Sequence, residues 1–590
     1  MTENCPENTA PFTGNATGNE FDFLHAVLKA WVGSLVGTVI IGMSFSLFSQ
    51  MGLGAWCSWG WVVFWCVYVF KGVKIPWSSF RFWPLLLLLA LTFVSLCVGL
   101  HAFLDSLTYR FPQMLFWLQE GRPHFIPHWD WRLNEMPHVW SYVTAPWYLL
   151  FGFQGTAMPS YIAYGILIYL TFCIALRYTS VPSARLVTLI FMSAPVFVMQ
   201  ASNTDNSMFT AALTLASAYF LLFAPRQASS IVWSALALAL ATGTKPQLLL
   251  LGFPWIAGCF WLHQKVIVAK WKVLLLFVPV GILASALPTL LWSALHPVAE
   301  KTGRYFPSFE NFVHSSKNIV PALLGIPYNP LANTLIDVTS IAQWRPVQLP
   351  DAASLGLLAT LAVCVGIVFS GRAAREIRYL AIASIVLLFA GFAVTGASYT
   401  GRSFIGYMVL FFPLAIYGLA KLPLRILQIW GGICLCAALF YIAMNPHMPL
   451  LPQKQFERSL SAIGLGRFIP QVQTFYSFRG RIDTLKDLLE RIPDDEKNIG
   501  VLCHSEMPLY NLWKGKRNVT IIQADTTLKD LQQRGIRYVL VSLEDQKSSQ
   551  TDMKQFLSRY SGSILAESDQ FGSLRRGPVR WFLVEIGQTG

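Results

Sequence analysis

The chain has 590 residues, of which 54% are hydrophobic and only 13% are charged. Charged residues make up about a quarter of an ordinary soluble domain, so this composition excludes a typical soluble enzyme and indicates a polytopic membrane protein. The net charge of +14 would suit a nucleic-acid partner, but most of the basic excess falls in short loops between apolar runs. There it serves to orient a membrane protein, and we expect no nucleic-acid partner.

Residues 1–25 are polar at first and lack the basic start and cleavage site of a secretory signal peptide. We expect them to form a cytoplasmic segment, with the first apolar run retained as an anchor. Residues 26–445 then carry about thirteen apolar runs of membrane-spanning character. The predicted spans are 26–49, 52–70, 83–103, 159–176, 186–200, 206–223, 229–243, 246–262, 273–295, 352–370, 379–396, 403–420 and 426–444.

Alternate loops between these spans collect the positive charge, so the positive-inside rule places those loops in the cytoplasm. The long loops 104–158 and 297–351 and the C-terminal segment then lie outside. The apolar stretch 136–153 would invert this alternation if it crossed the membrane, so we predict a helix on the outer surface instead. The basic residues of the cytoplasmic loops are Lys71, Lys74, Arg81, Arg177, Arg185, Arg226, Lys265, Lys270, Lys272, Arg372, Arg375, Arg378, Lys421 and Arg425.

The first outer loop begins with an acid directly after a span, Asp105. A carboxylate held at the end of an apolar helix could act as a base toward an incoming hydroxyl. Capping of the following helix is an equally good interpretation of this position. Further along the loop, Glu135 precedes Pro137 at the start of the predicted surface helix, where an acid also suits the helix dipole.

A third acid, Asp205, lies at an outward turn between two spans, where it too could cap a helix. Topology places Asp105, Glu135 and Asp205 on the same outer face. Three carboxylates could divide the roles of base and stabiliser between them. Together with a nearby histidine, His128 or His138, they could instead bind a divalent ion such as Mg²⁺ or Mn²⁺; the candidate ligands are Asp205, Glu135 and His128.

Two basic residues also fall on this outer face. Lys245 follows Gly243 and Thr244 at a turn between spans, and Arg402 lies at the outer end of a late span. A cation at membrane depth is usually retained for an anionic partner, and a lipid phosphate is the obvious one. The alternative is that both side chains snorkel to ordinary head groups.

Beyond residue 446 the composition changes to short apolar strands alternating with polar helices. This rhythm predicts a small extracytoplasmic α/β domain, 446–590, with a largely parallel sheet. The sequence contains no glycine-rich phosphate loop there, so we assign the domain no nucleotide. The expected strands are 499–503, 519–523, 537–542 and 580–586, and the expected helices are 484–491, 528–534 and 553–560.

The order of these features resembles the GT-C superfamily of integral membrane glycosyltransferases, in its branch of protein O-mannosyltransferase-like and aminoarabinose-transferase-like enzymes. The resemblance covers roughly residues 83–445. It rests on the acidic start of the outer loop with Tyr109, Pro112 and Trp117, on Glu135 with Pro137, on Asp205, on the Gly-Thr-Lys turn and on Arg402.

The resemblance implies a transferase in the cell membrane that takes a sugar from a polyprenyl-phosphate donor. The acceptor would be a hydroxyl of a glycan, lipid or protein outside the cytoplasm, and the anomeric carbon would be inverted. Asp105 would be the base, Glu135 and Asp205 would support it or a metal, and Lys245 and Arg402 would hold the phosphate. Ser106 stands where many relatives carry a second acid, which puts a metal requirement in doubt.

Two other functions fit an outer cavity with phosphate-binding cations. A transporter or flippase of a lipid-linked saccharide should show internal symmetry and charges deep within its spans, and the sequence shows neither. A non-catalytic assembly protein should tolerate replacement of the three acids. We therefore predict the glycosyltransferase.

Overall fold

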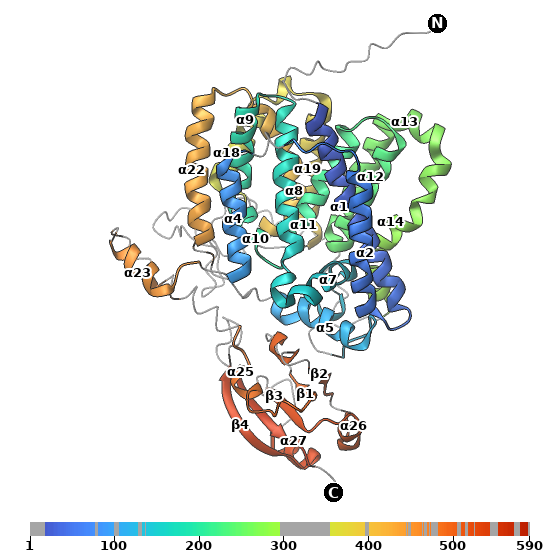
Figure 1. Cartoon of the computed structure of the whole chain (residues 1–590), viewed down its shortest axis with the longest axis vertical. Helices are drawn as coiled ribbons and strands as arrows, with labels where there is room; N and C mark the ends of the chain where they lie inside the picture. Colours follow the sequence, from blue (N-terminus) through green and yellow to red (C-terminus); the bar gives the residue numbers. More distant parts are fainter. Residues whose placement is uncertain are drawn as a thin grey trace.

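In a computed structural model, the chain forms an α-helical bundle with a small sheet domain at one end (Figure 1). The predicted fold class is confirmed. The structure describes residues 18–76, 81–98, 105–127, 132–135, 137–295, 354–395, 401–443, 445, 450–462, 482–503, 509–513, 517–523, 525–542, 553–570 and 579–587, with a few single residues between 464 and 473. The predicted outer loop 297–351 lies outside these residues.

The bundle is built from apolar helices, as expected of a multi-pass membrane protein. Among the described residues, four helices are long and apolar enough to cross a membrane, and two bent pairs raise the number to six. The four are α1 (Gly18–Ser46), α2 (Met51–Phe70), α8 (Met158–Leu176) and α22 (Leu424–Ala443). Further helices are α4 (Trp83–Val98), α11 (Ser207–Leu222), α12 (Ala228–Thr244), α15 (Leu287–Leu295), α18 (Gly356–Val368) and α19 (Arg375–Thr395).

Two predicted spans and one predicted loop differ from the observed helices. The segment predicted as 186–200 is bent by 76° between α9 (Val181–Met192) and α10 (Pro195–Ala201), because a proline opens the second helix. The loop predicted between residues 262 and 273 is instead part of α13 (Gly252–Leu276), which is kinked at Lys270. The predicted span 403–420 consists of α20 (Gly401–Met408), a 3₁₀ turn (Val409–Phe411) and α21 (Phe412–Leu419).

Several of the predicted cytoplasmic loops meet at one end of the bundle. The guanidinium of Arg177 lies over the rings of Phe21 and Phe223, at 5.0 and 5.3 Å from their centroids. The hydroxyl of Tyr417 donates to the carbonyl oxygen of Arg372 at 2.7 Å. The start of α1 and the ends of α8, α11 and α18 therefore share this end, opposite the sheet domain (Figure 1). This grouping agrees with the charge alternation, while the orientation in the membrane stays a prediction.

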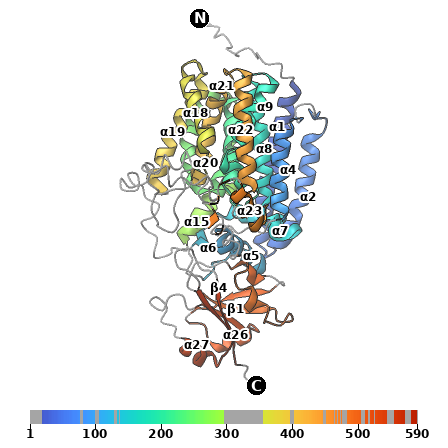
Figure 2. The same ribbon diagram turned by 90° about the vertical axis from the view of Figure 1, so that its left-hand side faces the viewer.

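Two helices of the first outer loop lie between the bundle and the sheet domain (Figures 1 and 2). They are α5 (Phe111–Glu120) and α7 (His138–Gly155). The predicted surface helix 136–153 corresponds to α7. Its first half, through Pro146, is buried, because it packs between the bundle and α5 instead of lying exposed on a membrane surface.

The C-terminal domain contains a five-stranded sheet in the order β2-β1-β3-β5-β4. Strands β1 (Asn498–Leu502), β2 (Asn518–Ile521) and β3 (Tyr538–Ser542) run parallel, whereas β5 (Val579–Glu585) is antiparallel to both β3 and β4 (Ser563–Gln570). The prediction of a largely parallel sheet is thus correct for one half only. Strand β4 was missed because it lies at the edge of the sheet, where most of its side chains are exposed and no buried alternation marks it.

Three short helices accompany the sheet, close to the predicted ones. They are α25 (Lys486–Leu489), α26 (Leu528–Gln533) and α27 (Met553–Tyr560). Thr527 and Asp530 form a capping box at the start of α26, in which each side chain accepts a hydrogen bond from the other's backbone N–H. This local signal explains why the boundary at residue 528 was predictable from sequence.

Candidate active site

The first outer loop begins with a π-helical turn, Ser106–Arg110, which leads directly into α5. Asp105 opens this turn with helical backbone angles, and among the described residues its carboxylate makes no capping hydrogen bond to the turn. The side chain is 22% exposed and lies 4.0 Å from the guanidinium of Arg110. Wide turns of this kind are frequent at functional sites. Asp105 is therefore presented at the surface of the site and does not serve as the cap of the helix that follows.

Arg110 joins the first outer loop to the turn before α11. Its Nη1 atom lies 2.5 Å from Oδ1 of Asp205, and the two side chains are 9% and 1% exposed. A second contact between the same segments links the hydroxyls of Ser106 and Thr204. The sequence analysis missed Arg110. Arg110 follows Asp105 by five residues. Because the turn between them is π-helical, this spacing brings the side chain of Arg110 back to the acid.

The second carboxylate oxygen of Asp205 is bound by the first residue of α11. Ser207 donates to Oδ2 of Asp205 at 2.5 Å, and Lys245 donates to the hydroxyl of Ser207 at 3.0 Å. The hydroxyl of Ser160 donates to the backbone oxygen of Asp205 at 2.7 Å. Both carboxylate oxygens of this acid are therefore engaged, and Lys245 is brought to the same group of side chains.

The Gly-Thr-Lys turn reaches this position because Gly243 allows a close approach. A Cβ atom at Gly243 would lie 2.3 Å from the carbonyl oxygen of Ala284 and 2.7 Å from a methyl group of Val139. The end of α12 is thereby packed against both α14 (Val278–Ala284) and α7. The glycine in the predicted phosphate-binding turn thus has a packing role, and it places Lys245 beside Ser207.

A further cation stands close to the turn. The guanidinium of Arg132 lies 4.4 Å from the ring centroid of Tyr109, and that of Arg110 lies 5.9 Å from the same centroid. The described charged side chains of this group are therefore three cations, Arg110, Arg132 and Lys245, and two carboxylates, Asp105 and Asp205. We call these five residues the polar cluster. Its excess of positive charge among described side chains suits an anionic ligand.

Buried side-chain amides connect α5 with α7 and with the loop that precedes α7. Gln113, which is 1% exposed, donates to the carbonyl oxygen of Leu133 at 2.9 Å and accepts from the hydroxyl of Ser141 at 2.8 Å. The side chain of Asn134 exchanges hydrogen bonds of 2.8 and 2.7 Å with the backbone of Ile126. These bonds fix the loop before α7 against α5, because a buried amide is costly to leave unpaired.

The sheet domain docks on the same loop. The backbone N–H of Leu509 donates to the carbonyl oxygen of Leu107, inside the π turn, at 3.0 Å. The amide of Gln119 donates to the oxygen of Val519 at 3.2 Å and accepts from its N–H at 2.9 Å. The ring of Phe116 packs edge-on against that of Trp513, with 4.8 Å between centroids. The C-terminal domain therefore supports the loop that carries Asp105.

Replacing Gln119 by Ala is expected to loosen this docking. It removes two hydrogen bonds and leaves the buried backbone groups of Val519 without their partner, at a cost of about 1–3 kcal/mol. Hydrogen exchange at β2 should speed up accordingly, while exchange within the bundle stays the same. Lys529→Ala, at an exposed position of α26, is the control. Unchanged protection of β2 in Gln119→Ala would show that the domain is held in another way.

The structure thus brings together three of the predicted site residues: Asp105, Asp205 and Lys245. The other predictions lie outside what it describes: His128 altogether, and the side chains of Glu135 and Arg402, whose backbones belong to α6 (Arg132–Glu135) and α20. Within the described part of the chain, no group of three His, Cys, Asp or Glu side chains could hold a metal ion. The predicted divalent ion therefore stays a prediction.

His138 was the alternative histidine for that metal. It is 6% exposed, and its ring lies edge-on to those of Trp117 and Trp292, at 4.8 and 5.4 Å between centroids. Burial lowers the pKa of His138 to about 4. Among the described residues, its surroundings are those of a neutral ring packed among indoles.

The lowered pKa of His138 predicts a pH-dependent stability. In the unfolded chain this ring titrates near 6.5, so between pH 6.5 and about 4 the unfolded state binds more protons than the folded one. The free energy of unfolding should then fall with decreasing pH by about 1.4 kcal/mol per pH unit from this group. The free energy of unfolding should be measured between pH 4 and 6.5 for the wild type and for His138→Leu. It should depend less steeply on pH in the variant, and equal slopes would contradict the prediction.

Solved structures of ArnT are similar to this chain. They come from Cupriavidus metallidurans, one bound to undecaprenyl phosphate and one in the apo state. Each is 14% identical to this chain, with TM-scores of 0.46 and 0.48, and the match covers 85% of this chain and 97% of the other. No protein-family model and no curated protein matches the sequence.

Proposed function

We propose that this protein is a membrane glycosyltransferase that moves a sugar from a polyprenyl-phosphate donor to an extracytoplasmic hydroxyl with inversion. The observation that carries the proposal is the polar cluster, in which an accessible carboxylate and several cations lie together at one end of an apolar bundle. The sequence resemblance of residues 83–445 supports it independently. The acceptor is a hydroxyl of a glycan, a lipid or a protein.

In this proposal Asp105 is the base. It is far more exposed than Asp205, whose two oxygens are occupied by Arg110 and Ser207. Asp105 takes the proton from the acceptor hydroxyl, and the acceptor oxygen then bonds to the anomeric carbon. The bond from that carbon to the phosphate oxygen breaks, and the polyprenyl phosphate leaves with the electron pair.

The cations act on the leaving group. Lys245 binds the phosphate by a charge-assisted hydrogen bond, together with Arg402, and stabilises the charge that gathers there as the bond breaks. Asp205 is a positioning residue, because its ion pair keeps Arg110 and the π turn in place next to Asp105. Lys245 is connected to the same unit through Ser207, so base and phosphate site are mechanically linked.

The proposal is tested by incubating the purified protein with a panel of polyprenyl-phosphate sugars and a mixture of hydroxyl acceptors, and by following release of polyprenyl phosphate. Release that depends on acceptor is expected. The same preparations, reconstituted in liposomes, measure movement of the intact lipid-linked saccharide across the bilayer. Movement of the lipid-linked saccharide without release of polyprenyl phosphate would favour the transporter over the transferase. In either case, Lys245→Met should weaken binding of the polyprenyl-phosphate donor to the purified protein.

A further inference from the structure

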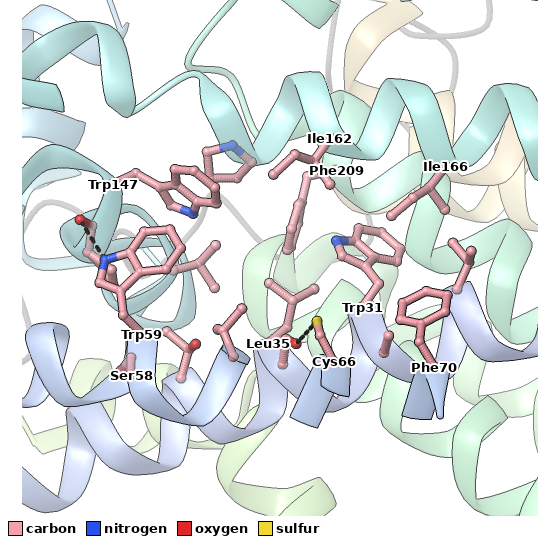
Figure 3. A pocket seen from close by; sticks show the side chains of 18 residues that line it. Trp31, Leu35, Ser58, Trp59, Cys66, Phe70, Trp147, Ile162, Ile166 and Phe209 are labelled. Atoms are coloured by element: carbon pink, nitrogen blue, oxygen red, sulfur yellow. Dashed lines mark hydrogen bonds between the residues drawn. The ribbon is translucent and has the colours of Figure 1, made fainter. Parts of the chain in front are cut away.

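An apolar slot lies between α1, α2 and α8, with part of α7 at one end (Figure 3). It has a volume of about 340 Å³. Trp59 and Trp147 stand at one end and Phe70 and Ile166 at the other, with Phe209 of α11 between them. Its lining is almost entirely apolar, so water gains little by entering it.

Two glycines of α1 fix the wall that α2 contributes. The indole of Trp61 donates to the oxygen of Gly33, and that of Trp65 donates to the oxygen of Lys29, both at 2.9 Å. A Cβ at Gly33 would lie 2.1 Å from the indole of Trp65, and one at Gly37 would lie 1.8 Å from that of Trp61. The two indoles therefore pack directly on the backbone of α1. The neighbouring face of α2, which carries Val62 and Cys66, lines the slot.

The lining residues form stripes along the helix axes. Four of the five lining residues of α2 are spaced four positions apart, namely Ser58, Val62, Cys66 and Phe70. On α1 the lining residues run from Val27 to Thr38. At about 1.5 Å per residue the slot is about 17 Å long. A cavity of about 150 Å³ holds one benzene molecule, so this slot has room for a single hydrocarbon chain of about a dozen carbon atoms.

Two residues that line the slot are close in sequence to residues that bind members of the polar cluster. Pro159 lines the slot, and its neighbour Ser160 donates to the backbone oxygen of Asp205. Phe209 lines it as well, two positions after Ser207, which binds both Asp205 and Lys245. The helices that line the slot thus also carry the residues that bind Asp205 and Lys245. An apolar slot on the same helices as these contacts fits an amphipathic ligand with one anionic head and a long tail.

We propose that this slot binds the first isoprenoid units of a polyprenyl phosphate whose head group lies at the polar cluster. The inference rests on the proposed function, which supplies the polyprenyl phosphate. It adds a binding site formed by α1 and α2, which precede residue 83 and so lie before the part of the chain on which the sequence resemblance rests. The same chemistry could come from an acyl chain of a membrane phospholipid, and the experiment separates the two sources.

The test uses photocrosslinking with two probes, a polyprenyl phosphate carrying a photoreactive group on an isoprene unit near the phosphate, and a phospholipid with such a group in its acyl chain. In the wild-type protein we expect the polyprenyl probe to label peptides of α1, α2 and α8. Excess undecaprenyl phosphate should compete for this labelling, whereas excess phospholipid should not. Val62→Phe fills the slot and should lower the labelling by roughly tenfold.

The matched control is Val63→Phe, the adjacent residue of α2, whose side chain is 62% exposed on the outer face. It should leave the labelling unchanged. Labelling of the slot by the phospholipid probe that undecaprenyl phosphate cannot displace would overturn the inference, as would polyprenyl adducts found only elsewhere in the wild type. Because labelling needs no sugar transfer, slot adducts in a protein without transferase activity would contradict the proposed function alone.

Discussion

Replacing Asp105 by Asn is expected to lower kcat for sugar transfer by about 10²- to 10⁴-fold, which is the usual contribution of a positioned general base. The amide has nearly the same shape as the carboxylate but cannot accept the proton of the acceptor hydroxyl. Because Asp105 is partly exposed and does not cap the π turn, folding should be little affected. Donor binding should persist as well, since the proposed phosphate contacts belong to other residues.

The measurement is single-turnover transfer from a pre-bound polyprenyl-phosphate sugar, with donor binding determined on the same preparations. Asp105→Glu is the informative companion, because it keeps the charge but moves the carboxylate, and it should retain more activity than Asp105→Asn. A variant Asp105→Asn that transfers sugar at the wild-type rate would exclude this residue as the base. A variant that transfers slowly and also fails to bind donor would assign Asp105 to binding instead.

Replacing Asp205 by Asn is expected to have the largest effect on stability. The carboxylate is 1% exposed and pairs at 2.5 Å with a guanidinium that is itself 9% exposed. Replacing Asp205 removes the close counter-charge of the buried Arg110 guanidinium and leaves it the carboxylate of Asp105 at 4.0 Å. We therefore expect a loss of up to about 3–5 kcal/mol of the free energy of unfolding, the cost of breaking a buried ion pair. Ser207→Ala removes only a neutral donor to the same carboxylate and should cost less.

The double variant Arg110→Met with Asp205→Leu separates the two roles of the pair. Apolar side chains of similar size often replace a buried ion pair with little loss of stability, so unfolding in detergent should return toward the wild-type value. Transfer should remain low, because Arg110 no longer stands beside Asp105. Recovery of both stability and transfer would mean that the pair serves the fold only. Equal stability of Asp205→Asn and wild type would contradict the buried ion pair itself.

Charge and hydrophobic periodicity were enough to predict the bundle, because each span needs a long apolar run and each loop on one side collects basic residues. Asp105, Asp205 and Lys245 were predictable for the same reason, since each stands at the end of such a run on the same side. The capping box at Thr527 and the buried strands β1 and β3 are likewise local signals, which a single sequence carries.

Only the tertiary structure decided how these residues are connected. The pairing of Arg110 with Asp205 spans 95 positions and that of Gln119 with Val519 spans 400, and no periodicity in the sequence refers to either. The burial of α7, the antiparallel strand β4 at the sheet edge and the slot between α1, α2 and α8 also arise from packing of segments distant in the chain. Sequence by itself determined which residues reach the same end of the bundle, because bilayer thickness and charge act on each segment separately. Which of them meet was decided by long-range contacts, because those depend on the positions of all the helices at once.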